Sequence, residues 1–124
     1  MGSRIFKNQQ LNQITLDESS IFSIKWVNEN GIDLEMEIDW CGQEDLKDEI
    51  DFLNVVTKLV FQLVSDIDFN FKHNDIWTIG ALEITNFSFN KLDERYSVEF
   101  RFDFQPIGHI KFNCNELYFE VIQK

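Results

Sequence analysis

The sequence predicts an all-β domain: a single antiparallel β-sandwich or flattened barrel of about seven or eight strands, with room for one short helical turn. Three observations carry this prediction. Several runs alternate apolar and polar residues with the period of two that is typical of strands. Turn-forming residues separate these runs at short intervals. The 124 residues are 44% apolar and include 13 phenylalanines, which is enough for one hydrophobic core.

The first half of the chain predicts an arm followed by a hairpin. Residues 1–20 are polar and predict an irregular N-terminal arm, with a short strand near residues 14–16. The first clear alternation covers residues 20–27, and an Asn-Gly turn signal follows it. Residues 32–40 then alternate without interruption, with one apolar and one acidic face. These two runs and their turn predict a β-hairpin.

The second half predicts further short strands. A charged loop is expected at residues 43–51. Residues 52–71 have apolar side chains at both helical and strand spacing, but their Val, Phe and Thr content favours two strands, or one strand bent at a bulge. The later alternating runs are separated by polar turns and by the single proline; they cover residues 82–89, 96–104, 110–114 and 117–122. Residues 1–124 are therefore expected to form a single domain.

Side chains on the apolar side of the alternating runs are predicted to form the core. The clearest six are Leu34, Met36, Ile38, Phe100, Phe102 and Phe112. Trp26 and Trp40 lie on the apolar faces of their strands and are expected in the core as well. Trp77 lies between a turn and a glycine, where burial and exposure on a sugar-binding platform both remain open.

The chain is acidic, with 22 Asp and Glu residues against 11 Lys and Arg, a net charge of −11. This balance disfavours binding to nucleic acid and to anionic membrane surfaces. It permits a basic protein partner, because opposite potentials speed association; general solubility is the alternative explanation. Ten acidic residues and one lysine fall between Glu29 and Asp51, a net charge of −9, and this concentration favours a partner-binding role.

The candidate partner-binding residues come from this acidic segment. They are Asp33, Glu35, Glu37, Asp39, Glu44, Asp45, Asp48, Glu49 and Asp51. Alternation places the first four on one face of the strand, and the others lie in the following loop. Alternatively, bases on a neighbouring strand, such as Arg101 or Lys111, lie across from the strand carboxylates and form ordinary cross-strand pairs. The sequence leaves both interpretations open.

Motifs for catalysis or metal binding are absent from the sequence. It has no glycine-rich phosphate loop and no nucleophile elbow. His73 and His109 are far apart in the chain and are expected at the surface or at an edge. The acidic loop lacks the spacing of a calcium-binding loop. We therefore predict no enzyme activity, no bound metal and no cofactor.

The two cysteines, Cys41 and Cys114, lack the spacing of a zinc or redox site and are expected to be free thiols. Residues 1–7 have no apolar run of the kind found in secretory leaders, and no segment approaches the ~20 apolar residues of a membrane helix. These features predict a cytoplasmic protein with reduced cysteines.

Four segments carry a family resemblance. They are SIFSIKW at residues 20–26, IDLEMEIDW at 32–40, TKLVFQLVSDIDF at 57–69 and GHIKFNCNELYFEV at 108–121. In their order and turns the chain resembles small uncharacterised bacterial all-β proteins, some of which are predicted immunity proteins of polymorphic toxin systems. It departs from them at Asp17-Glu18, where such proteins often have a His-Asp pair.

The resemblance implies an all-β fold and, through the immunity proteins, a role in binding and neutralising a toxin. Together with the acidic segment, it predicts a non-catalytic protein-binding domain whose partner is a basic toxin, for instance a nuclease. A small-ligand or carbohydrate-binding sandwich that uses exposed aromatic side chains is the alternative. The sequence makes no prediction of the oligomeric state.

Overall fold

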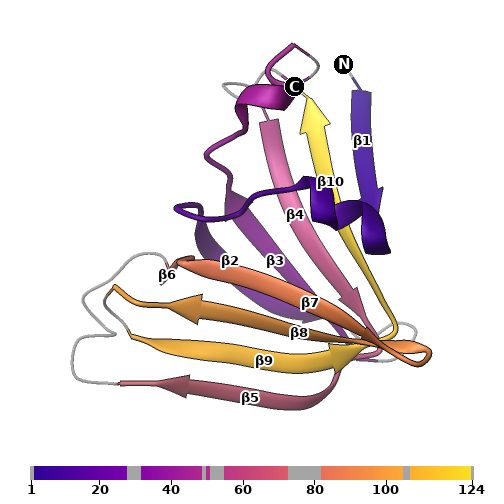
Figure 1. Ribbon diagram of the computed structural model, residues 1–124, viewed down its shortest axis with the longest axis vertical. Helices are drawn as coiled ribbons and strands as arrows, with labels where there is room; N and C mark the ends of the chain where they lie inside the picture. Colours follow the sequence, from indigo (N-terminus) through magenta and orange to yellow (C-terminus); the bar gives the residue numbers. More distant parts are fainter. Residues whose placement is uncertain are drawn as a thin grey trace.

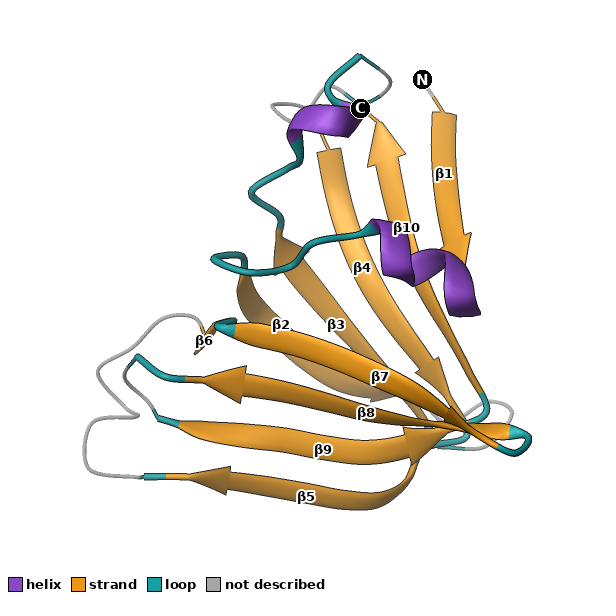
Figure 2. Ribbon diagram, in the orientation of Figure 1, coloured by secondary structure: helices purple, strands orange, loops and turns teal. Residues whose placement is uncertain are grey.

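The computed structural model describes residues 2–27, 32–48, 50, 55–72, 82–104 and 107–123. Within these residues the chain is almost entirely β-strand, with two short 3-10 helices (Figure 2). The elements are β1 (Gly2–Lys7), η1 (Asn8–Gln13), β2 (Ser20–Val27), β3 (Asp33–Asp39), η2 (Glu44–Leu46), β4 (Val55–Gln62), β5 (Ser65–Phe71), β6 (Leu82–Glu83), β7 (Asn86–Leu92), β8 (Arg95–Phe102), β9 (Gly108–Cys114) and β10 (Glu116–Gln123). The all-β prediction is confirmed, although the described strands number ten rather than seven or eight.

The strands form two antiparallel sheets that pack together. The six-stranded sheet has the order β1-β10-β4-β3-β2-β6, and the four-stranded sheet has the order β5-β9-β8-β7. Figure 1 shows the four-stranded sheet running across the six-stranded one, with the two sheets meeting where β4 leads into β5. The architecture is therefore sandwich-like.

The six predicted core residues are all buried, each at most 3% exposed. They come from both sheets, because β3 lies in the six-stranded sheet and both β8 and β9 lie in the four-stranded one. Aromatic rings fill the space between the sheets. Phe61 of β4 makes edge-to-face contacts with Phe112 and with Phe100, with ring centroids 4.8 and 6.1 Å apart.

The ambiguous segment at residues 52–71 contains two strands, as the composition favours. β4 and β5 belong to different sheets, and the chain turns between them at Leu63, whose φ is 54°. A second crossing of this kind follows β6, which lies in the six-stranded sheet, whereas β7 lies in the other. The change of phase in the sequence near residues 85–86 marks that crossing. The alternation is interrupted at Ser65-Asp66 in the first place, and in the second it shifts by one residue, from Leu82 and Ile84 to Phe87 and Phe89.

The prediction for the N-terminal arm is wrong. Residues Gly2–Lys7 form β1, an edge strand that pairs along its whole length with β10. The expected strand near residues 14–16 is absent from this described part of the chain, which instead follows η1 as an extended segment. Phe6, Leu11 and Leu16 are buried in the core. The arm is polar on average because most of its side chains face outward; within residues 4–20 the buried ones are Phe6, Leu11, Ile14, Leu16 and Ser19.

Trp40 is buried as predicted, whereas Trp26 is not. The Trp40 indole N–H donates to the carbonyl oxygen of Thr15 at 2.9 Å. Trp26 pairs with the buried Leu34 yet is 50% exposed. Its position on the strand is consistent with this: among the described residues, β6 pairs with Ser20 and Ile21 and does not reach the Trp26 end of β2. Trp77 lies outside the described residues.

Candidate functional site

The four acidic side chains of β3 share the outer face of the six-stranded sheet. Successive side chains of a strand point to opposite faces, and Leu34, Met36 and Ile38 are buried on the inner face. The outer face therefore carries the strand carboxylates of Asp33, Glu35, Glu37 and Asp39. The four carboxylates thus share one face of the sheet, as the alternation predicts.

Glu35 is held by two lysines from neighbouring strands. Its carboxylate lies 3.3 Å from the Lys58 ammonium of β4 and 3.7 Å from the Lys25 ammonium of β2, and its side chain is only 17% exposed. These are cross-strand pairs of the ordinary kind. The alternative interpretation, cross-strand pairing of the acidic residues, is thus correct for Glu35. The suggested bases are wrong, because Arg101 and Lys111 lie in the four-stranded sheet.

The other three strand carboxylates differ in their contacts. One Asp33 carboxylate oxygen accepts the backbone N–H of Leu63 at 3.0 Å and so supports the turn between β4 and β5. Within the described part of the chain, neither Glu37 nor Asp39 has a cation within 4 Å. These two carboxylates are therefore the ones most available to a partner.

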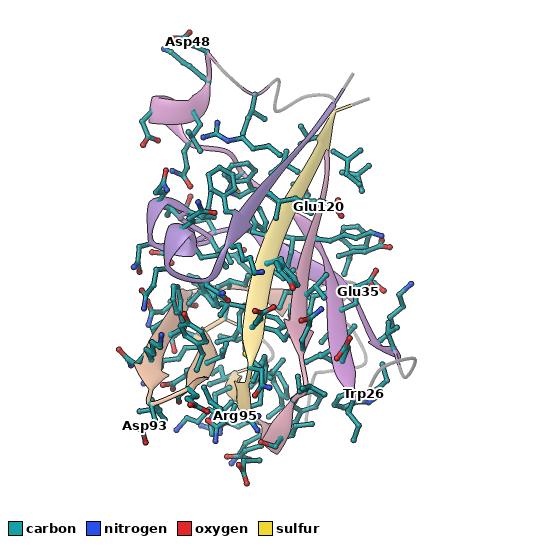
Figure 3. All side chains as sticks on the ribbon, turned by 90° about the vertical axis from the view of Figure 1, so that its right-hand side faces the viewer. Trp26, Glu35, Asp48, Asp93, Arg95 and Glu120 are labelled. Atoms are coloured by element: carbon teal, nitrogen blue, oxygen red, sulfur yellow. The ribbon has the colours of Figure 1, made fainter. Side chains whose placement is uncertain are left out.

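The loop carboxylates lie elsewhere. The expected helical turn is η2, and Asp45 accepts a hydrogen bond of 3.1 Å from the amide of Gln43, which also donates to the Gln13 carbonyl oxygen. Figure 3 places Asp48 at one end of the molecule, away from Glu35 on the sheet face. The Glu44 side chain, Glu49 and Asp51 lie outside the described residues. The predicted acidic segment thus divides between a sheet face and one end of the sandwich.

A shallow groove of about 280 Å³ adjoins the carboxylates on the same face. Its walls come from β1, β4 and β10, and its lining residues are Ile5, Lys7, Val60, Tyr118 and Glu120. The Tyr118 hydroxyl donates to the Glu116 carboxylate at 2.8 Å. Burial raises the pKa of Tyr118 to about 12, helped by that hydrogen bond and by the charges of Glu116 and Asp33. The sequence did not predict the groove because β1 was expected to be irregular.

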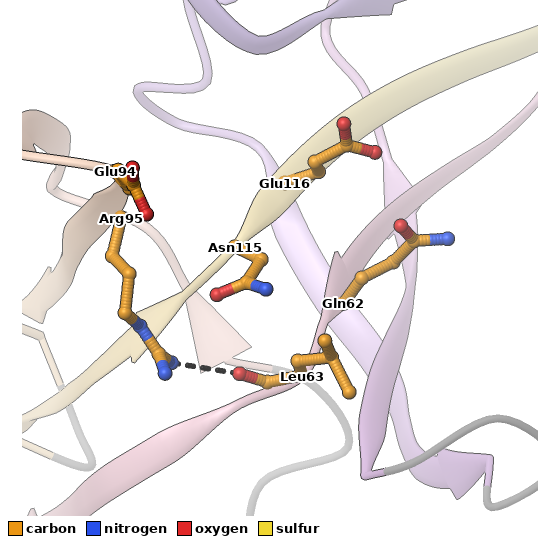
Figure 4. Close-up of a pocket in the computed structure, with 6 residues that line it drawn as sticks. All are labelled: Gln62, Leu63, Glu94, Arg95, Asn115 and Glu116. Atoms are coloured by element: carbon orange, nitrogen blue, oxygen red, sulfur yellow. Dashed lines mark hydrogen bonds between the residues drawn. The ribbon is translucent and has the colours of Figure 1, made fainter.

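A second, more polar hollow of about 400 Å³ lies at the corner between the sheets (Figure 4). It is lined by Gln62, Leu63, Glu94, Arg95, Asn115 and Glu116. The Arg95 guanidinium donates to the Leu63 carbonyl oxygen at 2.7 Å and to the Ser65 hydroxyl at 2.9 Å. Those contacts stabilise the β4–β5 turn, so we assign Arg95 a structural role rather than a ligand-binding one.

The remaining candidates do not assemble into a reactive centre in the described part of the chain. His109 is the second residue of β9, and its Nε2 lies 2.9 Å from a carboxylate oxygen of Asp68 on β5. His73 lies outside the described residues. Cys41 is exposed, Cys114 is buried, and both are free thiols. Among the described residues, no three His, Cys, Asp or Glu side chains gather as metal ligands, and no helix has the length and apolar character to cross a membrane.

Comparisons with protein-family models, with curated proteins and with solved structures find no match to this chain.

Proposed function

We propose that this chain is a non-catalytic protein-binding domain that docks a basic protein on the outer face of its six-stranded sheet. One observation carries the proposal: the described part of that face has seven carboxylates, from β3, β10 and β6, against three lysines, beside an apolar groove. An interface commonly combines an apolar centre with a charged rim. The groove at Tyr118 would be the centre, and Glu37 and Asp39 part of the rim.

The partner that we propose is a toxin of the nuclease type, so that the chain acts as an immunity protein. A nuclease must be basic to bind its polyanionic substrate. An acidic sheet face can therefore attract it over a distance and compete with the substrate for the same positive surface. The resemblance to bacterial proteins that include predicted immunity proteins supports this partner class.

The test neutralises the two available carboxylates. The Glu37→Gln/Asp39→Asn variant and a matched control, Asp17→Asn/Asp103→Asn, both change the net charge by +2, and Asp17 and Asp103 are exposed outside β3. Association is measured by stopped-flow fluorescence with the inactivated toxin domain encoded next to this chain. We expect the on-rate of the first variant to fall by roughly threefold to tenfold and its salt dependence to flatten.

Two results would contradict the proposal. Equal on-rates for the two variants would show that the sheet face does not attract the partner. A neighbouring reading frame without a basic toxin would remove the toxin class but leave a protein-binding role testable with other basic proteins. Glu35 is left unchanged because its two lysine contacts would add a folding effect to the measurement.

The alternative, a carbohydrate-binding sandwich, draws on the groove beside Tyr118 and on the exposed Trp26. The two aromatic side chains belong to opposite faces of the sheet by register, since Trp26 pairs with the buried Leu34 and Tyr118 pairs with the outward Lys7. A glycan platform needs aromatic rings on one surface. The register therefore favours the protein-binding proposal, and a glycan-array signal that Tyr118→Ala abolishes would reverse that preference.

A further inference from the structure

The strand β5 has an open edge. It pairs with β9 and ends the four-stranded sheet, and no other described strand lies beside it (Figure 1). The backbone N–H of Lys72 donates to the Ile107 carbonyl oxygen at 2.9 Å. Main-chain groups of an antiparallel strand alternate between its two sides. The N–H and C=O groups of Phe69 and Phe71 therefore point away from β9, toward the open edge.

The regular part of this edge is short. A bulge interrupts the β5–β9 register between Ser65 and Asp68, and Asp66 has a φ of 56°. Such a bulge bends the start of β5 and prevents this part of the strand from pairing regularly with another strand. From Asp68 onward the register is unbroken, and Lys72 continues it. Within the described part of this edge, residues 68–72 therefore form the segment that can accept another strand.

We propose that two copies of this chain form a symmetric dimer in which residues 68–72 pair antiparallel about Asn70. In this register Asp68 of each copy lies opposite Lys72 of the other, at both ends of the pairing. Phe69 lies opposite Phe71 of the second copy, and these two residues supply the main-chain hydrogen bonds. Asn70 lies opposite itself. The two four-stranded sheets join into one eight-stranded sheet.

The charge pattern of the edge fits a second copy of this chain. Opposite charges directly across an antiparallel pair are favourable, and like charges are not. Among the other long edge strands, β1 carries Arg4 and Lys7 and β7 carries Lys91, with no acidic residue in either. Neither of those edges can place a carboxylate opposite a cation in a two-fold pairing. The segment 68–72 can do so, because a two-fold pairing about Asn70 places Asp68 of each copy opposite Lys72 of the other.

The apolar side chains of β5, Phe69 and Phe71, are also left partly exposed in a single copy of the chain. Phe69 lies opposite the buried Ile110 but is 48% exposed, because β5 is the last strand of the sheet. Phe71 is half-buried and packs on Phe102 with ring centroids 5.5 Å apart. In the dimer the Phe69 ring gains a neighbour in Phe71 of the second copy, which extends the inner face of the sheet across the two-fold axis.

The dimer leaves the outer face of the six-stranded sheet untouched, so its test is independent of the proposed toxin binding. The first test reverses charges and follows mass by sedimentation velocity at ~100 µM, above the micromolar range expected for a small interface. The wild-type chain should sediment at twice its 14.8 kDa. Asp68→Lys alone and Lys72→Glu alone should both sediment as monomers, and an equimolar mixture of the two should recover the dimer. Wild-type chain that stays monomeric, or a mixture that does not recover, overturns the proposal.

The second test maps the register by cross-linking. In the Cys41→Ser background, Asn70→Cys places two thiols across the axis with Cα atoms about 4.5 to 5.5 Å apart, within reach of a disulfide. Asn90→Cys on β7 is the control, because Asn90 is also an exposed asparagine on an edge strand. Mild oxidation should give a covalent dimer with Asn70→Cys only. Equal cross-linking of both variants, or ladders of higher oligomers, would show random or head-to-tail contact and would overturn the two-fold pairing.

Discussion

Phe61 of β4 meets Phe112 of β9 edge-on across the interface between the sheets, with ring centroids 4.8 Å apart and planes at 74°. Both side chains are buried. The contact joins strands that belong to different sheets, so it reports on the packing of the whole sandwich rather than on one ladder.

Removing this contact should destabilise the domain strongly. We expect Phe61→Ala to lower the free energy of unfolding by about 3–5 kcal/mol, through lost transfer free energy and a cavity. Phe104→Ala, at a side chain that is 61% exposed, should stay within about 0.5 kcal/mol of wild type. Urea denaturation followed by tryptophan fluorescence measures both. Similar losses for the two variants would contradict the assigned core.

Gly108 allows β5 to lie close to β9. A Cβ at this position would lie 2.1 Å from the Asn70 carbonyl oxygen and 2.7 Å from a ring carbon of Phe71. Gly108→Ala should therefore force the two strands apart and cost about 1–3 kcal/mol. Hydrogen exchange by mass spectrometry should show faster exchange in residues 65–72. Lys111→Ala, at an exposed position on the same strand, should leave that exchange unchanged.

Arg95 should be required for the corner between the sheets. Its guanidinium joins the Leu63 carbonyl oxygen to the Ser65 hydroxyl, on either side of the point where the chain changes sheet. Arg95→Leu leaves these groups without that donor, and we expect a loss of about 1–3 kcal/mol in chemical denaturation. The exposed Arg101 provides the control: Arg101→Leu should be nearly neutral. A neutral Arg95→Leu would mean that the turn is stable by itself.

The buried thiol of Cys114 should make stability depend on alkaline pH. Burial raises the pKa of Cys114 from 9.0 to about 12, and the nearby Arg95 charge offsets only part of that shift. The unfolded chain loses this proton near pH 9 and the folded chain only near pH 12. The free energy of unfolding should thus be unaffected below pH 9 and should fall above it, by up to about 1.4 kcal/mol per pH unit.

Two measurements check this behaviour. Denaturation from pH 8 to pH 11 should show a smaller decline for Cys114→Ala than for wild type, with the remainder assigned to groups such as Tyr118. Alkylation of the native protein at pH 8 should modify the exposed Cys41 and leave Cys114 unmodified until the chain unfolds. Rapid labelling of Cys114 in the native state would place it outside the core.

The elements recovered from the sequence share one property: their pattern is local. Alternation at residues 34–38 and 96–102 assigns inward and outward side chains because the pleat repeats every two residues wherever the strand is placed. The interruption of the alternation at Ser65-Asp66 marks the change of sheet for the same reason. The acidic face of β3 follows from this rule as well, which is why its four carboxylates could be assigned to one face.

What only the tertiary structure decided depends on neighbours that are distant in sequence. Gly2–Lys7 becomes a strand because β10 provides hydrogen-bonding partners, and without β1 the groove at Tyr118 would lack a wall. The charge of Glu35 is offset by Lys25 and Lys58 because β3 lies between β2 and β4. Alternation within a single strand carries no information about this strand order. Trp26 is 50% exposed although its strand neighbour Leu34 is buried, because Trp26 lies at the end of β2 that the described part of β6 does not reach. Strand order and strand length set each of these environments, and both arise from long-range pairing.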